Sequence, residues 1–125
     1  MLVHEWAKEK IKEVKMTSHE KQKSYKQEIK GLGSMIVQNG LYGTLAFYNV
    51  KKEKKEFEEV AKVIVKQLKD LASTYLNIKD FDQFPPLENE KYLRAQELAI
   101  EAVSWLRRYA DILIKEEEEE KNDNS

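Results

Sequence analysis

Apolar residues recur every three or four positions along most of the chain, which is the spacing of one face of an α-helix. The pattern is clear over residues 2–15, from 57 to 77, and from 89 onward. In the last stretch the apolar face is widened by Leu98, Trp105 and Ile112. A face of this width predicts that the C-terminal helix lies at the centre of a bundle.

The stretch 31–52, GLGSMIVQNGLYGTLAFYNVKK, holds all four glycines of the chain and carries no charge before its last two residues. Asn39-Gly40 divides it, and apolar residues keep the helical spacing on both sides: Tyr25, Ile29, Leu32 and Ile36 before, Leu41, Leu45 and Tyr48 after. Glycine is the usual residue just past a helix end because it adopts positive φ freely. We therefore predict a helix ending near residue 38, a glycine corner, and a second helix over residues 41–50.

A β-hairpin with an Asn-Gly turn is the competing interpretation of this stretch. The flanking apolar residues repeat every three to four positions and not every two, which favours two helices. The small residues Gly33, Gly43 and Ala46 are expected to let these two helices approach each other closely.

The whole pattern predicts an all-α fold, a compact bundle of five or six helices in one domain over residues 1–115. Residues 17–20, Thr-Ser-His-Glu, match a capping box at the start of the second helix. The pattern breaks around Pro85-Pro86, where Phe81 and Phe84 are expected to enter the core. Residues 116–125, EEEEEKNDNS, are expected to form a disordered acidic tail.

The distribution of charge matters more than its sum, which is −1 at pH 7. The last eleven residues hold two lysines against five glutamates and one aspartate, so the preceding 114 residues carry +3. A mildly basic folded part permits contact with nucleic acid without requiring it. The sequence has no cysteine and no apolar run that could span a membrane, so we expect no disulfide, no membrane anchor and a cytoplasmic location.

Candidate catalytic chemistry is sparse. Both histidines precede a glutamate, but a helical zinc site needs a second histidine four residues on, and those positions hold Lys8 and Lys23. The glycines of residues 31–33 lack the third glycine of a dinucleotide-binding fingerprint. The sequence therefore predicts no catalytic residue, no metal site, no cofactor and no enzymatic activity. A small enzyme with an unfamiliar site is the weakest alternative.

Basic residues are the more informative candidates, because they gather in clusters that suit phosphate groups. The first cluster shares one predicted helix face and consists of Lys23, Lys26 and Lys30. The second lies at the end of the glycine-corner helix and consists of Lys51, Lys52, Lys54 and Lys55. The third lies on the C-terminal helix and consists of Arg94, Arg107 and Arg108. Gln38 and Asn39 at the corner could contact RNA or cap a helix. The candidate RNA-binding residues are Lys23, Lys26, Lys30, Gln38, Asn39, Lys51, Lys52, Arg94, Arg107 and Arg108. Solvated surface patches are the alternative interpretation.

Two segments together carry a family resemblance. The first holds Met35-Ile36, then Asn39-Gly40-Leu41-x-x-Thr44-Leu45-Ala46-Phe47 and a closing Lys51. The second runs from Tyr92 to Ala110 and ends in Trp-Leu-Arg-Arg-Tyr-Ala. With these motifs the chain resembles the small helical subunit of the type III-B CRISPR effector, the Cmr complex, from about Lys23 to Ala110.

The resemblance implies a non-catalytic structural subunit of an RNA-guided antiviral complex. Such subunits stack along a filament of guide-binding backbone subunits, next to copies of themselves. They help to hold target RNA, paired with the guide RNA, for cleavage attributed to the backbone subunits. Basic side chains would then hold phosphates while base pairing supplies specificity. A small helical protein-interaction scaffold without nucleic-acid contact is the alternative, and its affinity would depend much less on salt.

Overall fold

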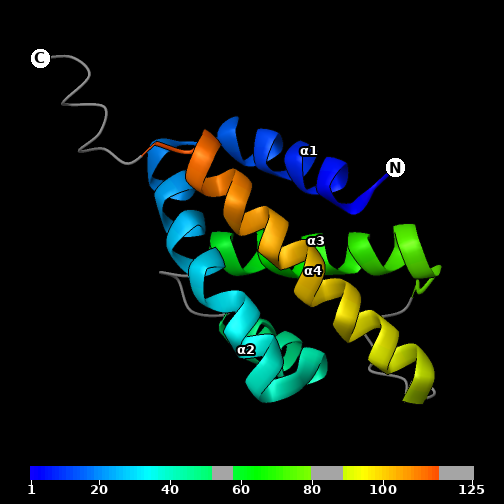
Figure 1. The fold of residues 1–125 in the computed structure, drawn as a ribbon. Helices are drawn as coiled ribbons and strands as arrows, with labels where there is room; N and C mark the ends of the chain where they lie inside the picture. The colour runs from blue at the N-terminus through cyan, green and yellow to red at the C-terminus, as the bar shows by residue number, and fades with distance from the viewer. Residues whose placement is uncertain (52–57, 80–88, 116–125) are drawn as a thin grey trace, which may run out of the picture.

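The structure, a computed structural model, describes residues 1–51, 58–79 and 89–115, and within them the chain forms four helices (Figure 1). These are α1 (Val3–Lys15), α2 (His19–Lys51), α3 (Glu58–Leu76) and α4 (Asn89–Leu113). The all-α prediction is confirmed, whereas five or six helices is wrong for the described residues. The difference arises because the two helices predicted on either side of Asn39-Gly40 form one kinked element, α2.

The C-terminal helix α4 crosses the middle of the molecule, and both α1 and α2 pack against it (Figure 1). Its buried face is rich in small side chains: Ala95, Ala99, Ala102 and Ala110. Small side chains at a contact reduce the distance between helix axes, so two neighbours can approach α4 closely. The central position predicted for the C-terminal helix is confirmed.

The kink in α2 lies at Gly40, whose φ of 75° and ψ of 165° are not helical. The chain after it needs partners for the backbone N–H groups that begin a new helical segment. α4 supplies them, because Leu41 N–H donates to Gln96 Oε1 at 3.1 Å and Tyr42 N–H donates to the Tyr92 hydroxyl oxygen at 3.3 Å. The predicted helix, glycine corner and helix are confirmed, and a tertiary contact caps the second arm of α2 (residues 41–51).

The small residues of α2 were expected to lie between its two arms, and the structure places them differently from one another. Gly33 faces Val103 of α4, with a distance of 3.7 Å from its hypothetical Cβ to Val103 Cγ1. Gly43 is exposed, but its hypothetical Cβ would lie 3.2 Å from Asn39 Cβ at the end of the first arm (residues 19–39), whereas Ala46 is exposed on the second arm. Gly33 therefore permits a close approach between the first arm of α2 and α4, and Gly43 permits one between the two arms at the kink.

The turn from α1 into α2 is held by side chains that satisfy free backbone groups. The Ser18 hydroxyl accepts a hydrogen bond from Lys21 N–H at 3.3 Å, as an N-cap residue does. The side-chain amide of Gln22 donates to the carbonyl oxygens of Thr17 and Lys15 at 2.8 and 3.2 Å. A hydroxyl cap is therefore present, but Ser18 supplies it, whereas the Thr17 hydroxyl donates to the carbonyl oxygen of Val14 at 2.6 Å.

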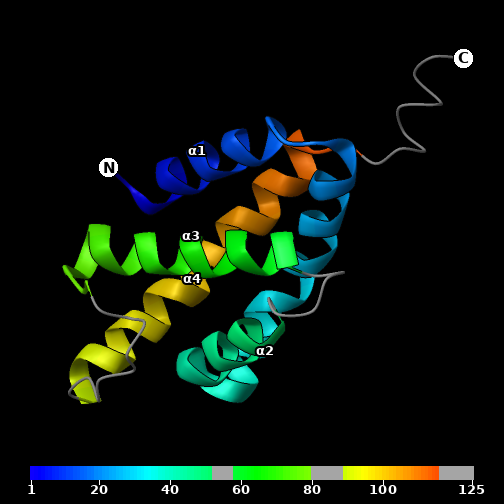
Figure 2. The same ribbon diagram turned by 180° about the vertical axis from the view of Figure 1, so that it is seen from behind.

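α1 runs antiparallel to α3 (Figure 2). Hydrogen bonds join α3 to the start of α1 and to the residue Met1 before it. Trp6 Nε1 donates to Asp70 Oδ2 at 2.8 Å, and the Tyr75 hydroxyl donates to the carbonyl oxygen of Met1 at 2.9 Å. Partial burial opposes ionisation of Asp70, but hydrogen bonds from Trp6 and Lys10 outweigh it and hold the pKa of the carboxyl below its ordinary value.

Three sequence-based expectations fall outside the described residues. They concern Phe81 and Phe84 as core residues, Lys52 as an RNA-binding residue, and the acidic tail over residues 116–125. These expectations stay predictions.

Candidate nucleic-acid interface

A groove of about 370 Å³ lies between the first arm of α2 and the C-terminal half of α4. Three of the predicted RNA-binding residues line it: Lys30 and Gln38 from α2, and Arg107 from α4. Residues far apart in the sequence are thus brought to one surface by the packing of α2 on α4.

Helical spacing explains how each wall presents these side chains. On α2 the lining residues repeat every three to four positions, which keeps them on one face: Ile29, Lys30, Gly33, Ser34, Val37 and Gln38. On α4 they do the same: Ile100, Val103, Ser104 and Arg107. The groove exists partly because Gly33 has no side chain to fill it. Val37 stays 65% exposed there, although it is a large apolar residue.

The lining combines cationic and neutral hydrogen-bond donors. Lys30 and Arg107 supply positive charge, and Arg presents a planar fork that matches two phosphate oxygens. Ser34 and Ser104 add hydroxyl groups that sequence reasoning missed. The missed signal was their spacing, since Ser34 follows Lys30 by four residues and Ser104 precedes Arg107 by three. Such a set of donors can hold a phosphate group without reading a base.

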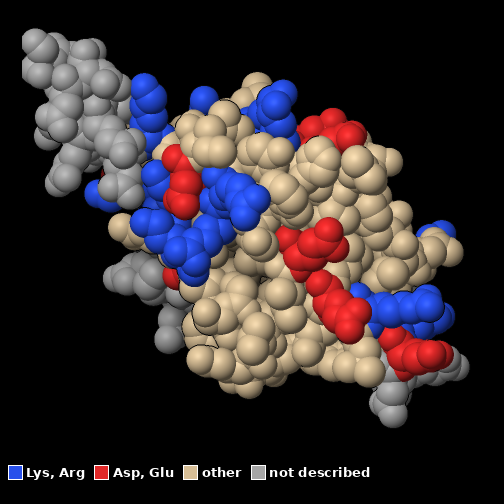
Figure 3. Space-filling view, in the orientation of Figure 1, with Lys and Arg blue, Asp and Glu red and all other residues tan. Residues whose placement is uncertain are grey.

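Lys and Arg side chains gather over this side of the molecule (Figure 3). The patch covers the region where the first arm of α2 and the end of α4 lie in Figure 1. Some acidic surface lies among these basic side chains, and further acidic side chains lie over the middle of α4 in the same view. The positive surface is therefore local, which a net charge of −1 for the whole chain conceals.

Lys26 requires a correction, because it is not an exposed member of the first cluster. Its side chain is 6% exposed, and Lys26 Nζ donates to the carbonyl oxygen of Ile114 at 2.8 Å. Ile114 directly follows α4, where backbone carbonyls lack helical partners and a cation is favourable. In this structure Lys26 caps α4 from inside the core, whereas Lys23 and Lys30 are exposed.

The arginine cluster is divided by the helix. Arg107 lines the groove, whereas the guanidinium carbon of Arg108 lies 4.8 Å from the ring centroid of Trp105. The centroid of the Trp105 ring also lies 5.4 Å from the centroid of the His4 ring of α1. Arg108 therefore lies on the side of α4 that faces α1. Arg94 is exposed, and it lies about 20 Å from Arg107 along the axis of α4.

The remaining predicted residues do not line the groove among the described residues. Lys23 and Asn39 are exposed on α2 outside it. Lys51 ends α2, but the position of its side chain is not described, and Lys52 lies outside the described residues.

In the described ranges 1–51, 58–79 and 89–115, no group of three or more His, Cys, Asp or Glu residues is placed to hold a metal ion. No described helix combines the length and the apolar character needed to cross a membrane.

The tyrosines with strongly shifted pKa values are core residues: burial raises the pKa of Tyr25, and burial together with Glu28 raises that of Tyr48. The Tyr25 hydroxyl donates to Gln67 Oε1 at 2.8 Å.

Comparison with known proteins places the chain in a family. A family model described as CRISPR-associated protein Cmr5 matches residues 2–113. The CRISPR system Cmr subunit Cmr5 of Thermotoga maritima is 36% identical over 121 residues, which cover 93% of this chain and 87% of that protein. No solved structure matches the chain significantly. The family match spans all four helices and confirms the resemblance stated from the sequence motifs. The chain therefore belongs to the Cmr5 family of CRISPR-associated proteins.

Proposed function

We propose that this chain is a non-catalytic structural subunit of the type III-B CRISPR effector, the Cmr complex. It stacks along the filament of guide-binding backbone subunits, next to copies of itself. It holds target RNA by its phosphates while the guide RNA supplies sequence specificity. Family membership supports the complex, and the groove between α2 and α4 supports the contact with RNA.

The observation that most strongly supports contact with RNA is that Lys30 and Arg107 line the same groove from two different helices. Each residue comes from a different helix, so the positive charge is a property of the packed surface and not of one helix. The neutral donors Gln38, Ser34 and Ser104 line the same groove, and its walls hold no acidic residue among the described lining residues. A nucleic-acid backbone is the polyanion that such a set of donors suits in an RNA-guided complex.

Reversing the charge of Lys30 and Arg107 together is expected to weaken retention of target RNA in the assembled complex by about tenfold or more at moderate salt. The reason is that two phosphate contacts become repulsive. The measurement is RNA affinity over a series of salt concentrations, where the slope of log affinity against log salt is expected to become less steep by about 1.4 for single-stranded RNA.

The matched control is the same double reversal at Lys8 and Lys12, which are exposed on α1 and change the net charge equally. Affinity and slope that fall equally in both double variants would show a general charge effect. Unchanged retention in the Lys30→Glu/Arg107→Glu variant would remove the groove from the RNA contact.

The second arm of α2 supports a contact of another kind, with protein. Its outer side carries Gly43, Ala46, Phe47 and Val50 at helical spacing, and none of the described side chains on that side is charged. Phe47 and Val50 are 46% and 63% exposed. An uncharged apolar face is unusual on a chain in which 36% of residues are charged, and such faces mark interaction sites. We assign this face to the guide-binding backbone subunit.

Phe47→Glu is therefore expected to reduce co-purification of the chain with the backbone subunit by about tenfold or more, the usual effect of removing an aromatic anchor. Glutamate is a good helix former, so α2 is expected to persist. Pull-down yield measures the effect, and circular dichroism of the isolated chain checks its helical content. Ser24→Glu, an exposed position on the first arm of α2, is the control. Full co-purification of the Phe47→Glu variant would contradict the assignment.

A further inference from the structure

A larger groove, of about 490 Å³, lies between α1, the start of α2, and α3. α1 and α3 run antiparallel and are joined by the hydrogen bond between Trp6 and Asp70 (Figure 2). The groove runs from the end of α1 and the beginning of α3 past Asp70 to Ser73 and Lys79. It takes no part in the contacts proposed above, since neither the groove between α2 and α4 nor the outer side of the second arm shares a residue with it.

The floor of the groove is apolar. Val14 and Val60 are each 6% exposed, and Val63 is half-buried. Of the polar groups on the floor, the Tyr25 hydroxyl donates to Gln67 Oε1 at 2.8 Å. The floor thus offers a mainly apolar surface to an occupant.

The rim is rich in lysine. Among the described residues that line the groove, five lysines stand against three acidic residues: Lys10, Lys21, Lys66, Lys69 and Lys79 against Glu13, Glu59 and Asp70. Lysine stems cover apolar surface while their charged heads stay in water, so the same side chains extend the apolar walls and make the rim positive. An occupant that matches this lining has an apolar side and an excess of carboxylates.

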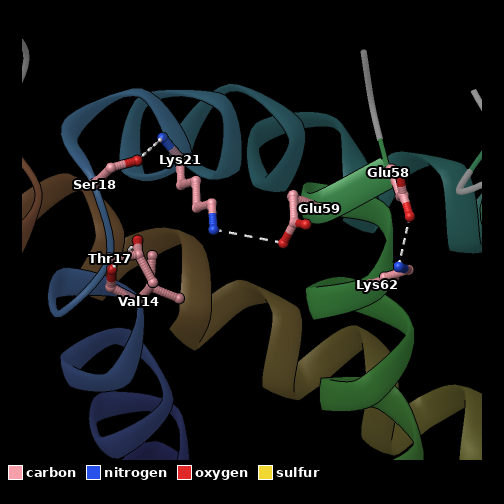
Figure 4. Close-up of polar contacts among 7 residues, drawn as sticks. All are labelled: Val14, Thr17, Ser18, Lys21, Glu58, Glu59 and Lys62. Atoms are coloured by element: carbon pink, nitrogen blue, oxygen red, sulfur yellow. Dashed lines mark hydrogen bonds and ion pairs between the residues drawn. The ribbon is translucent and has the colours of Figure 1, made fainter. Parts of the chain in front are cut away.

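One end of the groove is spanned by a weak contact (Figure 4). Lys21 of α2 reaches Glu59 at the start of α3, with a distance of 3.5 Å between Lys21 Nζ and Glu59 Oε2. The two side chains are 50% and 64% exposed, so water competes for each of them. A carboxylate of an incoming partner can replace Glu59 without loss of a buried interaction.

We propose that this groove binds an acidic amphipathic helix of another protein subunit of the Cmr complex. Its apolar residues rest on the three valines, and its carboxylates pair with the lysine rim. A trough between antiparallel helices of 13 and 19 residues has the geometry of helix-in-groove recognition. RNA is disfavoured, because the three acidic lining residues would repel a continuous run of phosphates.

The test is site-specific photo-crosslinking in the purified complex, and it rests on the proposed function. A benzoylphenylalanine probe replaces Lys66 on the rim, and the control probe replaces Lys12, which is exposed on the side of α1 away from the groove. The probe at 66 is expected to crosslink a protein segment at least fivefold more than the probe at 12. Mass spectrometry is expected to identify an acidic segment with apolar residues three and four apart.

A second variant tests the charges without altering the floor. With the probe at Ser73, another lining residue, Lys66→Glu/Lys79→Glu is expected to lower the crosslinking yield several-fold. Equal yields at positions 66 and 12, crosslinks to RNA, a second copy of this chain, or a segment that is not acidic would each overturn the inference. Failure of the tagged chain to co-purify with any Cmr subunit would overturn the proposed function, and this inference with it.

Discussion

Gly40→Ala is expected to lower the free energy of unfolding by about 2–4 kcal/mol. The backbone at Gly40 has a φ of 75° and a ψ of 165°, a combination that is essentially restricted to glycine. An added Cβ would lie 2.7 Å from the Tyr92 hydroxyl oxygen and 3.4 Å from Gln96 Oε1. These atoms accept the hydrogen bonds that cap the second arm of α2, so the substitution disturbs the backbone and its cap together. Urea denaturation measures the change.

Gly31→Ala is the matched control for this prediction. Gly31 lies inside α2 with nothing within 4 Å of its hypothetical Cβ and with no positive φ. Alanine there is expected to raise stability by about 0.4–1 kcal/mol, because it restricts the unfolded chain and favours the helix. Two variants of equal stability would contradict the special role assigned to Gly40. A destabilised Gly31→Ala variant would indicate that the first arm is packed more tightly than described.

The glycine corner was predictable because it depends on local chemistry. Asn39-Gly40 interrupts two apolar stripes, and glycine is the residue that reaches positive φ without a steric cost. Its caps were not predictable, since Tyr92 and Gln96 lie more than fifty residues later in the chain. Helical spacing places a side chain on a face of its own helix and does not say which other helix that face meets.

The same limit explains the candidate site. Lys26 and Lys30 are four residues apart and share a face of α2, so the sequence gives them equivalent positions. They differ in the structure because the end of α4 covers Lys26 and leaves Lys30 at the groove. Arg107 and Arg108 show the reverse case, where neighbours in sequence point to different partners. The sequence therefore identifies clusters of basic residues, but the packing of α2 on α4 decides which of these residues share an exposed surface.

Lys26→Glu is expected to destabilise the domain by about 3–5 kcal/mol, a large fraction of the stability of a small domain. The change removes the hydrogen bond from Lys26 Nζ to the carbonyl oxygen of Ile114. It also buries a carboxylate beside that carbonyl oxygen, at the helix end where negative charge is unfavourable. Thermal and urea unfolding measure the loss, which is expected to appear before any RNA is added.

Lys26→Met separates the structural role of Lys26 from a role in RNA binding. Methionine keeps the apolar stem but donates no hydrogen bond, so the expected cost is about 1–3 kcal/mol and the domain is expected to stay folded. Lys30→Glu is the matched surface variant, with an expected change in stability within about 0.5 kcal/mol. If Lys26 acts as the cap of α4, Lys26→Met lowers stability and leaves RNA retention unchanged. Lys30→Glu then lowers RNA retention and leaves stability nearly unchanged. A folded Lys26→Met variant that loses RNA as strongly as Lys30→Glu would return Lys26 to the RNA-binding surface.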